Sequence, residues 1–199
     1  MKRLIILIIL GVVWGYAFGQ GDTDDLLKSV QSKYNSTTSI SVNFNKSTGS
    51  KEDFSGKLFL KKENKLRIEL KNNIIVTDGN TFWNYDKKQK KVIINNYDAS
   101  DPSEFSLDSF VNDYPAKCTL SSGTEGDFRT LTLVPKSNDL NFKTAKLFIN
   151  ETSLIEKVVL VNNAGTSTIT LSGYMLNQNI PDTEFTFSPP EGIKVIDLR

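Results

Sequence analysis

Residues 75–86 read IVTDGNTFWNYD, and this stretch decides the fold class. Its Asp78-Gly79 pair lies between an apolar run that ends at Val76 and an aromatic run that begins at Phe82. An Asp-Gly pair between two such runs is a strong short-range signal for a hairpin, because both residues suit the positive φ angles of a tight turn. The stretch therefore predicts two antiparallel strands joined by a short turn.

The two-residue period of this hairpin continues along most of the chain. Apolar and polar residues alternate in many short runs, which is typical of half-buried antiparallel strands. So many consecutive strands would make an impractically wide flat sheet, and we expect the sheet to curl into a barrel or half-open barrel. A two-sheet sandwich is the competing architecture. Strands are expected at 40–44, 58–60, 66–70, 74–76, 82–85, 92–94, 118–120, 128–134, 142–149, 154–161, 166–176, 185–187 and 193–196.

A helix is expected before the first strand. Asp22 is placed to cap it, and Leu26, Val30 and Tyr34 form an apolar stripe at helical spacing. Such a stripe needs a partner surface, so the helix should lie against the sheet.

A second helix is expected between the strands, with Asp101 as its N-cap. Leu107, Phe110 and Val111 fall on one face of it, and Pro115 should stop it. Two amphipathic helices are natural covers for the open side of a curled sheet. The predicted fold is therefore mainly β with a few helices.

The N-terminus has the pattern of an export signal. Lys2 and Arg3 precede an apolar run over 4–14, which is too short to cross a hydrocarbon core that needs about 20 helical residues. Ala17 and Gly19 are small residues of the kind found before a signal peptidase cut.

We therefore expect residues 1–19 to be a cleaved signal peptide and residues 20–199 to form one exported domain. Gln20 stands where a lipid-anchored protein would carry a cysteine, so the mature chain is expected to be soluble.

Composition narrows the function. The formal net charge is +1 and the basic residues are interspersed with acidic ones, so no nucleic-acid footprint stands out. The lysine-rich stretch 87–91 is interpreted as a solvated hairpin turn. Cys118, the only cysteine, cannot form an internal disulfide. It alternates with the apolar residues Ala116 and Leu120 on one face of a strand, so it is interpreted as a small core residue.

The chain contains no histidine, which removes the common ways to activate a serine or cysteine nucleophile and the histidine-containing zinc sites of hydrolytic enzymes. A glycosidase needs only two carboxylates, yet no acidic pair has an evident arrangement for it. We expect a protein that is not an enzyme and that uses no cofactor or metal.

Four stretches then carry a family resemblance. They are 42–45 (VNFN), 56–66 (GKLFLKKENKL), 75–86 and 185–193 (FTFSPPEGI), in this order along the chain. Together they resemble the motifs of the LolA family of outer-membrane lipoprotein carriers. A lone Asp-Gly hairpin would be weak support, whereas four ordered motifs behind a signal peptide are specific.

This resemblance implies an unclosed antiparallel β-barrel with an α-helical lid, whose apolar hollow holds the acyl chains of lipoproteins during transit through the periplasm. A palmitoyl-sized chain has about 15 methylenes worth about 0.8 kcal/mol each, so exposing one to water costs about 12 kcal/mol. The implied partners are an inner-membrane lipoprotein-releasing ABC transporter complex and an unidentified outer-membrane acceptor. A monomer that binds no nucleic acid is expected.

The candidate residues follow from this implied fold. For each position a packed core is the alternative interpretation, because any barrel needs core residues on the same faces. The underside of the lid is expected to carry Leu107, Phe110 and Val111. The acyl-chain lining is expected to comprise Leu58, Leu60, Leu66, Ile68, Val76, Trp83, Val92 and Ile94.

Lys62 is a possible lid latch. Many members of the family carry Arg-Pro where this chain has Lys62-Glu63, and that arginine is thought to hold the closed lid through backbone hydrogen bonds. Lysine is a flexible point charge and not a rigid five-donor fork, so a weaker latch is expected. An exposed lysine at a strand end is the alternative.

Two other functions remain open. A receptor of the related LolB type would share the fold, but it should be anchored through a cysteine where this chain has Gln20. A sensor of lipids or hydrophobic ligands at the cell envelope is the second alternative, and the sequence does not separate it from a carrier.

Overall fold

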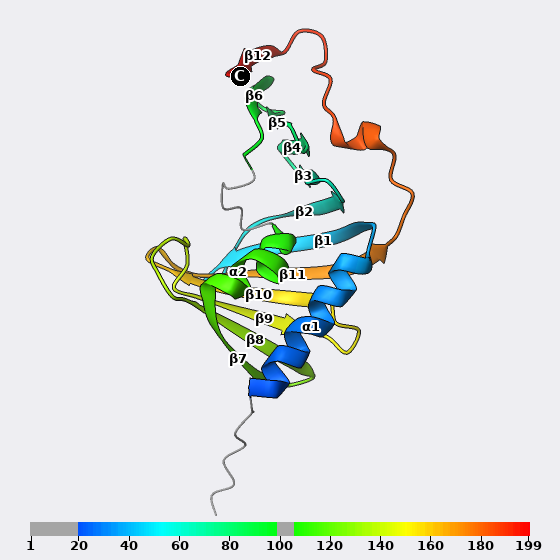
Figure 1. Cartoon of the computed structure of the whole chain (residues 1–199). Helices are drawn as coiled ribbons and strands as arrows, with labels where there is room; N and C mark the ends of the chain where they lie inside the picture. Colours follow the sequence, from blue (N-terminus) through cyan, green and yellow to red (C-terminus); the bar gives the residue numbers. More distant parts are fainter. Residues whose placement is uncertain (1–19, 99–105) are drawn as a thin grey trace, which may run out of the picture.

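The computed structural model describes residues 20–98 and 106–199, and its main feature is one long curled sheet under two helical segments (Figure 1). All strands of the described part belong to this sheet. They are β1 (Ser39–Thr48), β2 (Lys51–Lys61), β3 (Lys65–Leu70), β4 (Asn73–Asp78), β5 (Thr81–Asp86), β6 (Lys91–Asn96), β7 (Cys118–Glu125), β8 (Phe128–Pro135), β9 (Thr144–Ile149), β10 (Ile155–Asn162), β11 (Gly165–Leu176) and β12 (Lys194–Asp197).

The strand order is β12-β6-β5-β4-β3-β2-β1-β11-β10-β9-β8-β7, so the two halves of the chain meet where β1 pairs with β11. Neighbouring strands are antiparallel, except that β12 pairs parallel with β6. Within the described residues the edge strands β12 and β7 do not pair with each other. The half-barrel prediction is confirmed, and the two-sheet alternative is wrong.

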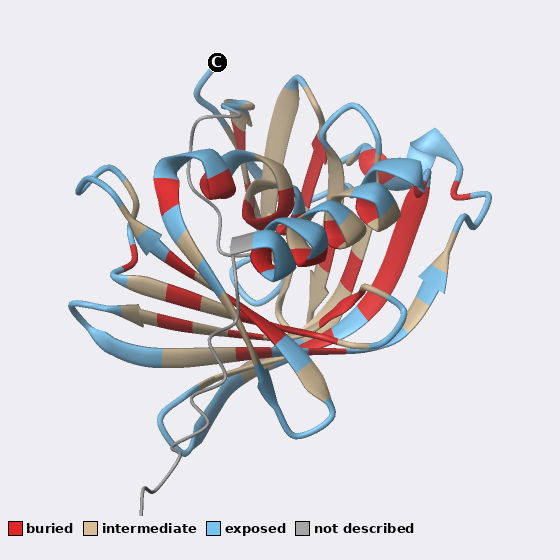
Figure 2. Ribbon diagram, turned by 60° about the horizontal axis from the view of Figure 1, so that its bottom comes forward, coloured by how far each residue is buried: buried red, intermediate tan, exposed pale blue. Residues whose placement is uncertain are grey.

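Helix α1 spans Gln20–Ser36 and covers the concave face of the sheet (Figure 2). Its predicted apolar stripe is confirmed, since Leu26, Val30 and Tyr34 are buried. The helix begins at Gln20, so Asp22 lies in its first turn and does not cap it. There the carboxylate still faces the positive end of the helix dipole. No helix in the described ranges is long and apolar enough to cross a bilayer.

The second helical segment, called the lid helix below, spans residues 107–117. It contains a π-helical stretch, Ser109–Asp113, followed by α2 (Tyr114–Lys117). Its expected N-cap, Asp101, lies outside the described residues. The prediction that Pro115 ends the helix is wrong, because Pro115 lies in the first turn of α2.

A side chain from α1 compensates for this proline. Pro115 has no N–H to donate to the carbonyl of Val111 one turn earlier. Gln31 of α1 donates its Nε2 hydrogen to that carbonyl at 3.1 Å. The π-helical stretch and this contact let the helix continue past the proline while tying it to α1.

The main core lies between the concave face of the sheet and the two helical segments. Fully burying an aliphatic side chain stabilises a fold by about 1.5–3 kcal/mol. Cys118 is 3% exposed in this core, which agrees with its interpretation as a small apolar residue. The largest contributions come from Leu26, Val30, Val42, Leu58, Phe110, Leu131, Leu133, Leu147, Ile149 and Ile155.

Residues 177–193, called the C-terminal strap below, connect β11 to β12 and run outside the sheet (Figure 1). The strand expected at 185–187 is wrong, because Phe185 ends a 3₁₀ turn, η2 (Asp182–Phe185), and the residues after it are irregular. Prolines 181, 189 and 190 lack the N–H that a ladder needs. The 3₁₀ turn contacts β3 and β4, and Phe185 is fully buried.

Candidate functional site: an apolar cavity under the lid helix

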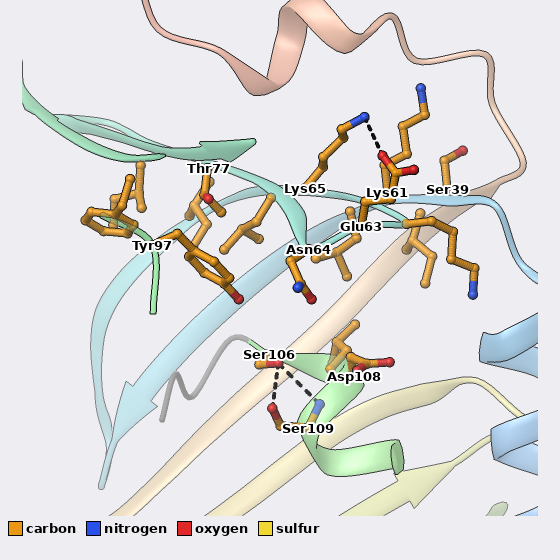
Figure 3. Close-up of a pocket in the computed structure, with 18 of the residues that line it drawn as sticks. Ser39, Lys61, Glu63, Asn64, Lys65, Thr77, Tyr97, Ser106, Asp108 and Ser109 are labelled. Atoms are coloured by element: carbon orange, nitrogen blue, oxygen red, sulfur yellow. Dashed lines mark hydrogen bonds and ion pairs between the residues drawn. The ribbon is translucent and has the colours of Figure 1, made fainter. Parts of the chain in front are cut away.

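A cavity of about 890 Å³ lies between the concave face of β2–β6, the end of α1 and the start of the lid helix (Figure 3). Pockets for small ligands typically enclose 300–1,000 Å³ and are mostly apolar. The cavity therefore has the size and chemistry to enclose an elongated hydrophobic ligand. Its apolar lining comprises Ile40, Leu60, Leu66, Ile68, Ile75, Phe82 and Leu107.

Polar side chains surround one part of this cavity. In Figure 3, Asn64 and Tyr97 point into the space between the strands and the lid helix. Ser109 of the lid helix and Ser106, directly before that helix, face them, with their hydroxyl oxygens 2.8 Å apart. An apolar floor with a polar rim suits an amphipathic ligand, because its chain can be buried while its head keeps polar partners.

The structure brings part of the predicted set to the cavity. Leu60, Leu66 and Ile68 line it from the strands, and Leu107 lines it from the lid helix. Leu58 lies on the same face of the sheet but is 1% exposed within the packed core. The remaining lid residues, at 110 and 111, are also packed in that core and do not line the cavity.

Four predicted residues lie on the opposite, convex face. Val76 follows Ile75, which pairs with Ile68 of the cavity, so Val76 points to the other side. Trp83 pairs with Val76 and shares its face. Val92 and Ile94 belong to the same face, because Ile94 pairs with Trp83. The expectation that these four line the hollow is therefore wrong.

The error has a physical cause. The runs at 74–76, 82–83 and 92–94 are apolar on consecutive positions, so both faces of this part of the sheet are hydrophobic. The C-terminal strap covers the convex face. Alternation within each strand does not reveal this cover. Three apolar lining residues were missed: Ile75 and Phe82 are direct neighbours of predicted ones, and Ile40 lies on β1. The inward positions of β3, continued through the tight β3–β4 turn in hairpin register, would have placed Ile75 on the cavity face.

The two hairpin tips beside the cavity pack closely together. Glu63 and Asn64, in the β2–β3 turn, have φ angles of 66° and 58°, in the left-handed region that is used in tight turns. Gly79, in the predicted Asp-Gly turn, approaches this turn so closely that a Cβ would lie 2.3 Å from the Glu63 oxygen. Only glycine fits there, and the contact fixes where Lys62 and Asn64 lie.

Lys62 begins a chain of polar contacts between the hairpin and both helical segments. Its Nζ donates to the backbone oxygen of Asn35, in the last turn of α1, at 3.0 Å. The Asn35 and Asn112 side-chain amides donate to each other at 3.3 and 3.1 Å. Asn112 also donates to Asp108 at 2.6 Å. Lys62 therefore contacts α1 directly and the lid helix through Asn35.

Neighbouring lysines hold the C-terminal strap. Asp182 accepts hydrogen bonds from Lys61 at 2.5 Å and Lys65 at 3.1 Å. These bonds, that of Lys61 first, lower the pKa of the Asp182 carboxyl. Lys65 also pairs with Glu63 at 3.0 Å, and the bonds to Glu63 and then Asp182 raise the pKa of Lys65. Because the carboxylates are exposed, each pair contributes little stability by itself.

Tyr97 remains a hydrogen-bond donor at the rim of the cavity. Burial raises the pKa of its phenol, and the negative charges of Asp108, Asp98 and Asp113 raise it further. The hydroxyl is therefore protonated at neutral pH. No group of three or more His, Cys, Asp or Glu side chains in the described part of the chain is placed to hold a metal ion.

The buried Tyr34 and the half-buried Tyr174 fasten α1 on the other side of the cavity. Tyr34 of α1 accepts from the Ile155 N–H at 3.3 Å and lies 3.2 Å from the Tyr174 hydroxyl. Tyr174 donates to the Ile155 oxygen at 2.5 Å. Burial raises the pKa of Tyr34 to about 12, so the hydroxyl stays neutral. These contacts fix the end of α1 to β10 and β11.

The open sheet, the lid helix and the apolar cavity define a half-barrel that can enclose a hydrophobic ligand. The chain belongs to the family described as outer membrane lipoprotein carrier protein LolA, whose model matches residues 35–188. The family resemblance found in the sequence is confirmed.

Similar proteins span nearly the whole chain. An outer-membrane lipoprotein carrier protein of Pseudomonas putida (strain GB-1) is 26% identical and covers 97% of this chain and 96% of its own length. A protein of the same name from Chromobacterium violaceum is 27% identical, covering 79% and 80%.

Solved structures support the fold. An uncharacterized conserved protein from Thermus thermophilus superposes with a TM-score of 0.60 at 13% identity, covering 87% of this chain and 98% of that one. MucB superposes with a TM-score of 0.54 at 12% identity, covering 89% and 66%.

Proposed function

We propose that this chain is a periplasmic carrier that holds the acyl chains of lipoproteins in its cavity and takes them from the inner to the outer membrane. The observation that carries the proposal is the apolar cavity of about 890 Å³ under the lid helix in a member of the carrier family. Exposing a C16 chain to water costs about 12 kcal/mol, and the cavity of a carrier must offset most of that cost.

The role needs a chain that leaves one membrane to reach the other. Residues 1–19 are proposed to act as a signal peptide, and the mature single domain is proposed to begin at Gln20, where no cysteine is available for lipid attachment. The carrier would work as a monomer that binds and releases its cargo without a chemical step.

Two partners follow from this route. An inner-membrane lipoprotein-releasing ABC transporter complex is proposed to load the cavity, and an outer-membrane acceptor, whose identity is open, to empty it. Because release must follow capture, the cavity should hold its ligand with only moderate affinity.

Opening is proposed to involve the lid helix. Its apolar residue at the cavity is Leu107. Lys62 is proposed as the latch, because its bond to Asn35 links the hairpin to the polar contacts that reach Asn112. A bound acyl chain would lie against Leu60, Leu66 and Ile68, beneath the lid helix.

The experiment is mass spectrometry of the protein purified from its native compartment under non-denaturing conditions. Lipoprotein carrying acyl chains, bound in a one-to-one complex, would support the carrier. Free fatty acid or no ligand, together with no transfer of lipoprotein out of inner-membrane vesicles, would contradict the carrier function. Free fatty acid alone would favour the lipid sensor.

A further inference from the structure

Six lysines gather at the end of the sheet opposite the β2–β3 turn. They come from the β3–β4 turn, the β5–β6 turn and the first residues of β6 and β12. Backbone hydrogen bonds bring these segments together, from Lys87 to Asn72 and from Lys194 to Lys90, both at 2.8 Å. We call this surface the basic end, and it comprises Lys71, Lys87, Lys88, Lys90, Lys91 and Lys194.

The positive charge of the basic end is not balanced locally. Within the described ranges, none of the six lysines forms an ion pair, whereas Lys61 and Lys65 at the other end are both paired. Asp86 is the only acidic residue in the two turns, and its carboxylate accepts from the N–H groups of Lys88 and Gln89. The whole chain has 24 basic and 23 acidic side chains, so this cluster is a local concentration.

An exposed apolar side chain adjoins this surface. Val195, directly after Lys194 in β12, is 49% exposed, whereas the exposed Leu198 follows the other end of the strand, beside Ile94. Figure 1 shows β12 beside β6 at the outer limit of the sheet. Cationic and apolar side chains together are the chemistry that attracts a protein to a membrane surface.

We propose that the basic end docks the protein on a bilayer surface that contains anionic phospholipids. The inference rests on the proposed carrier function, in which the chain must approach two membranes. A lipid surface fits better than an acidic protein, because protein interfaces favour Arg, Tyr and Trp and are depleted in Lys. All six cations here are lysines, and each adds about fivefold to partition onto an anionic bilayer.

The geometry leaves the cavity accessible in the docked state. The cavity lies near the β2–β3 turn, whereas the lysines lie past Leu70 and Asp86 at the far ends of β3 and β5. Strand β3 spans six residues, which is about 20 Å. Docking would hold the carrier at the membrane with its cavity and the Lys62 contacts clear of the lipid. Affinity for the bilayer should therefore be the same with and without cargo.

The test is co-sedimentation of the purified exported protein with large vesicles of phosphatidylcholine, with and without 30% phosphatidylglycerol. We expect binding to the anionic vesicles only, weakening as salt is raised. Lys88→Gln with Lys90→Gln should lower the partition about thirtyfold, as expected for two such lysines. The control is Lys28→Gln with Lys143→Gln, which removes two exposed charges outside the basic end and should bind like the wild type.

Three results would overturn the docking proposal. These are no binding to anionic vesicles at low salt, equal loss in the control variant, and binding to native membranes that protease treatment of the membranes abolishes. The last result would assign the basic end to an acidic protein. Vesicle binding by a protein that neither carries lipoprotein nor transfers it out of inner-membrane vesicles would leave the docking surface in place and reject only the carrier function.

Discussion

Lys62 connects the β2–β3 hairpin beside the cavity with the helical segments that lie over the cavity. Among the described residues its ammonium donates to one acceptor, the Asn35 oxygen. The lid helix is reached through the amide pair of Asn35 and Asn112. A guanidinium in the same place would have five donors in a fixed plane and could bind several acceptors at once. The lysine therefore gives a contact that breaks with the loss of one hydrogen bond.

Lys62→Ala should open the lid helix more often with little effect on global stability. A hydrogen bond from a charged donor is worth about 1.5 kcal/mol, so amide exchange in residues 107–117 should accelerate about tenfold. Hydrogen exchange followed by mass spectrometry checks this. Lys62→Arg should slow the exchange relative to alanine. Unchanged exchange in Lys62→Ala would mean that Lys62 is only an exposed strand-end lysine.

The ion pairs of Asp182 predict a dependence of stability on pH. The pKa of this carboxyl is lower in the folded protein than its ordinary value of 3.8, so the pairs stabilise the fold above that value. This stability is lost as pH falls through the lowered pKa. Asp182→Asn should therefore be less stable at neutral pH and lose less stability on acidification. Urea unfolding of the wild type and of the variant, at neutral pH and after acidification, measures the difference. Equal loss of stability on acidification in the two proteins would contradict the prediction.

At the scale of elements, the C-terminal strap gives the sheet a second apolar layer. The fully buried Phe185 lies on the strap, and Phe187 stacks on Tyr85 of β5 with ring centroids 5.1 Å apart. Val76, Val92 and their neighbours are buried on this side, which explains why strands predicted to have one wet face are apolar on both.

Phe185→Ala should destabilise the protein by about 3–5 kcal/mol, because it removes a fully buried aromatic ring. Phe187→Ala is the matched control and should cost clearly less, since that ring is only half-buried. Chemical denaturation of the two variants provides the measurement. A similar cost for both would show that the strap does not depend on the burial of Phe185.

The sequence predicts the order and type of most elements, because alternation and the Asp-Gly turn are local signals. It fails where a distant segment decides the outcome. The side chain of Gln31 lets a helix continue through Pro115, and the strap hides the convex face. Alternation within β4 does not show which of Ile75 and Val76 faces the cavity, because both are apolar. The pairing of Ile75 with Ile68 assigns Ile75 to the cavity.

At the scale of the whole molecule, the two halves of the sheet have different interiors. The tyrosines 34 and 174 fasten α1 to β10 and β11, and the Thr23 hydroxyl accepts from the Ser122 N–H of edge strand β7. That half is filled by a packed core. Over β2–β6 the cover is partial, and the space beneath it is the cavity. The half with the packed core thus holds α1 in place, and the half formed by β2–β6 contains the space for a ligand.

The central claim is that this cavity holds acyl chains, and two adjacent residues of β4 test it most directly. Ile74 and Ile75 are both half-buried, but only Ile75 lines the cavity. The measurement is release of a triacylated lipoprotein from inner-membrane vesicles into a soluble complex with the purified protein, in the presence of the loading complex. We expect Ile75→Glu to abolish the soluble complex, because a carboxylate in the cavity would be buried against the chain. Ile74→Glu should form it like the wild type. Equal yields from both variants, with both proteins folded, would contradict the account.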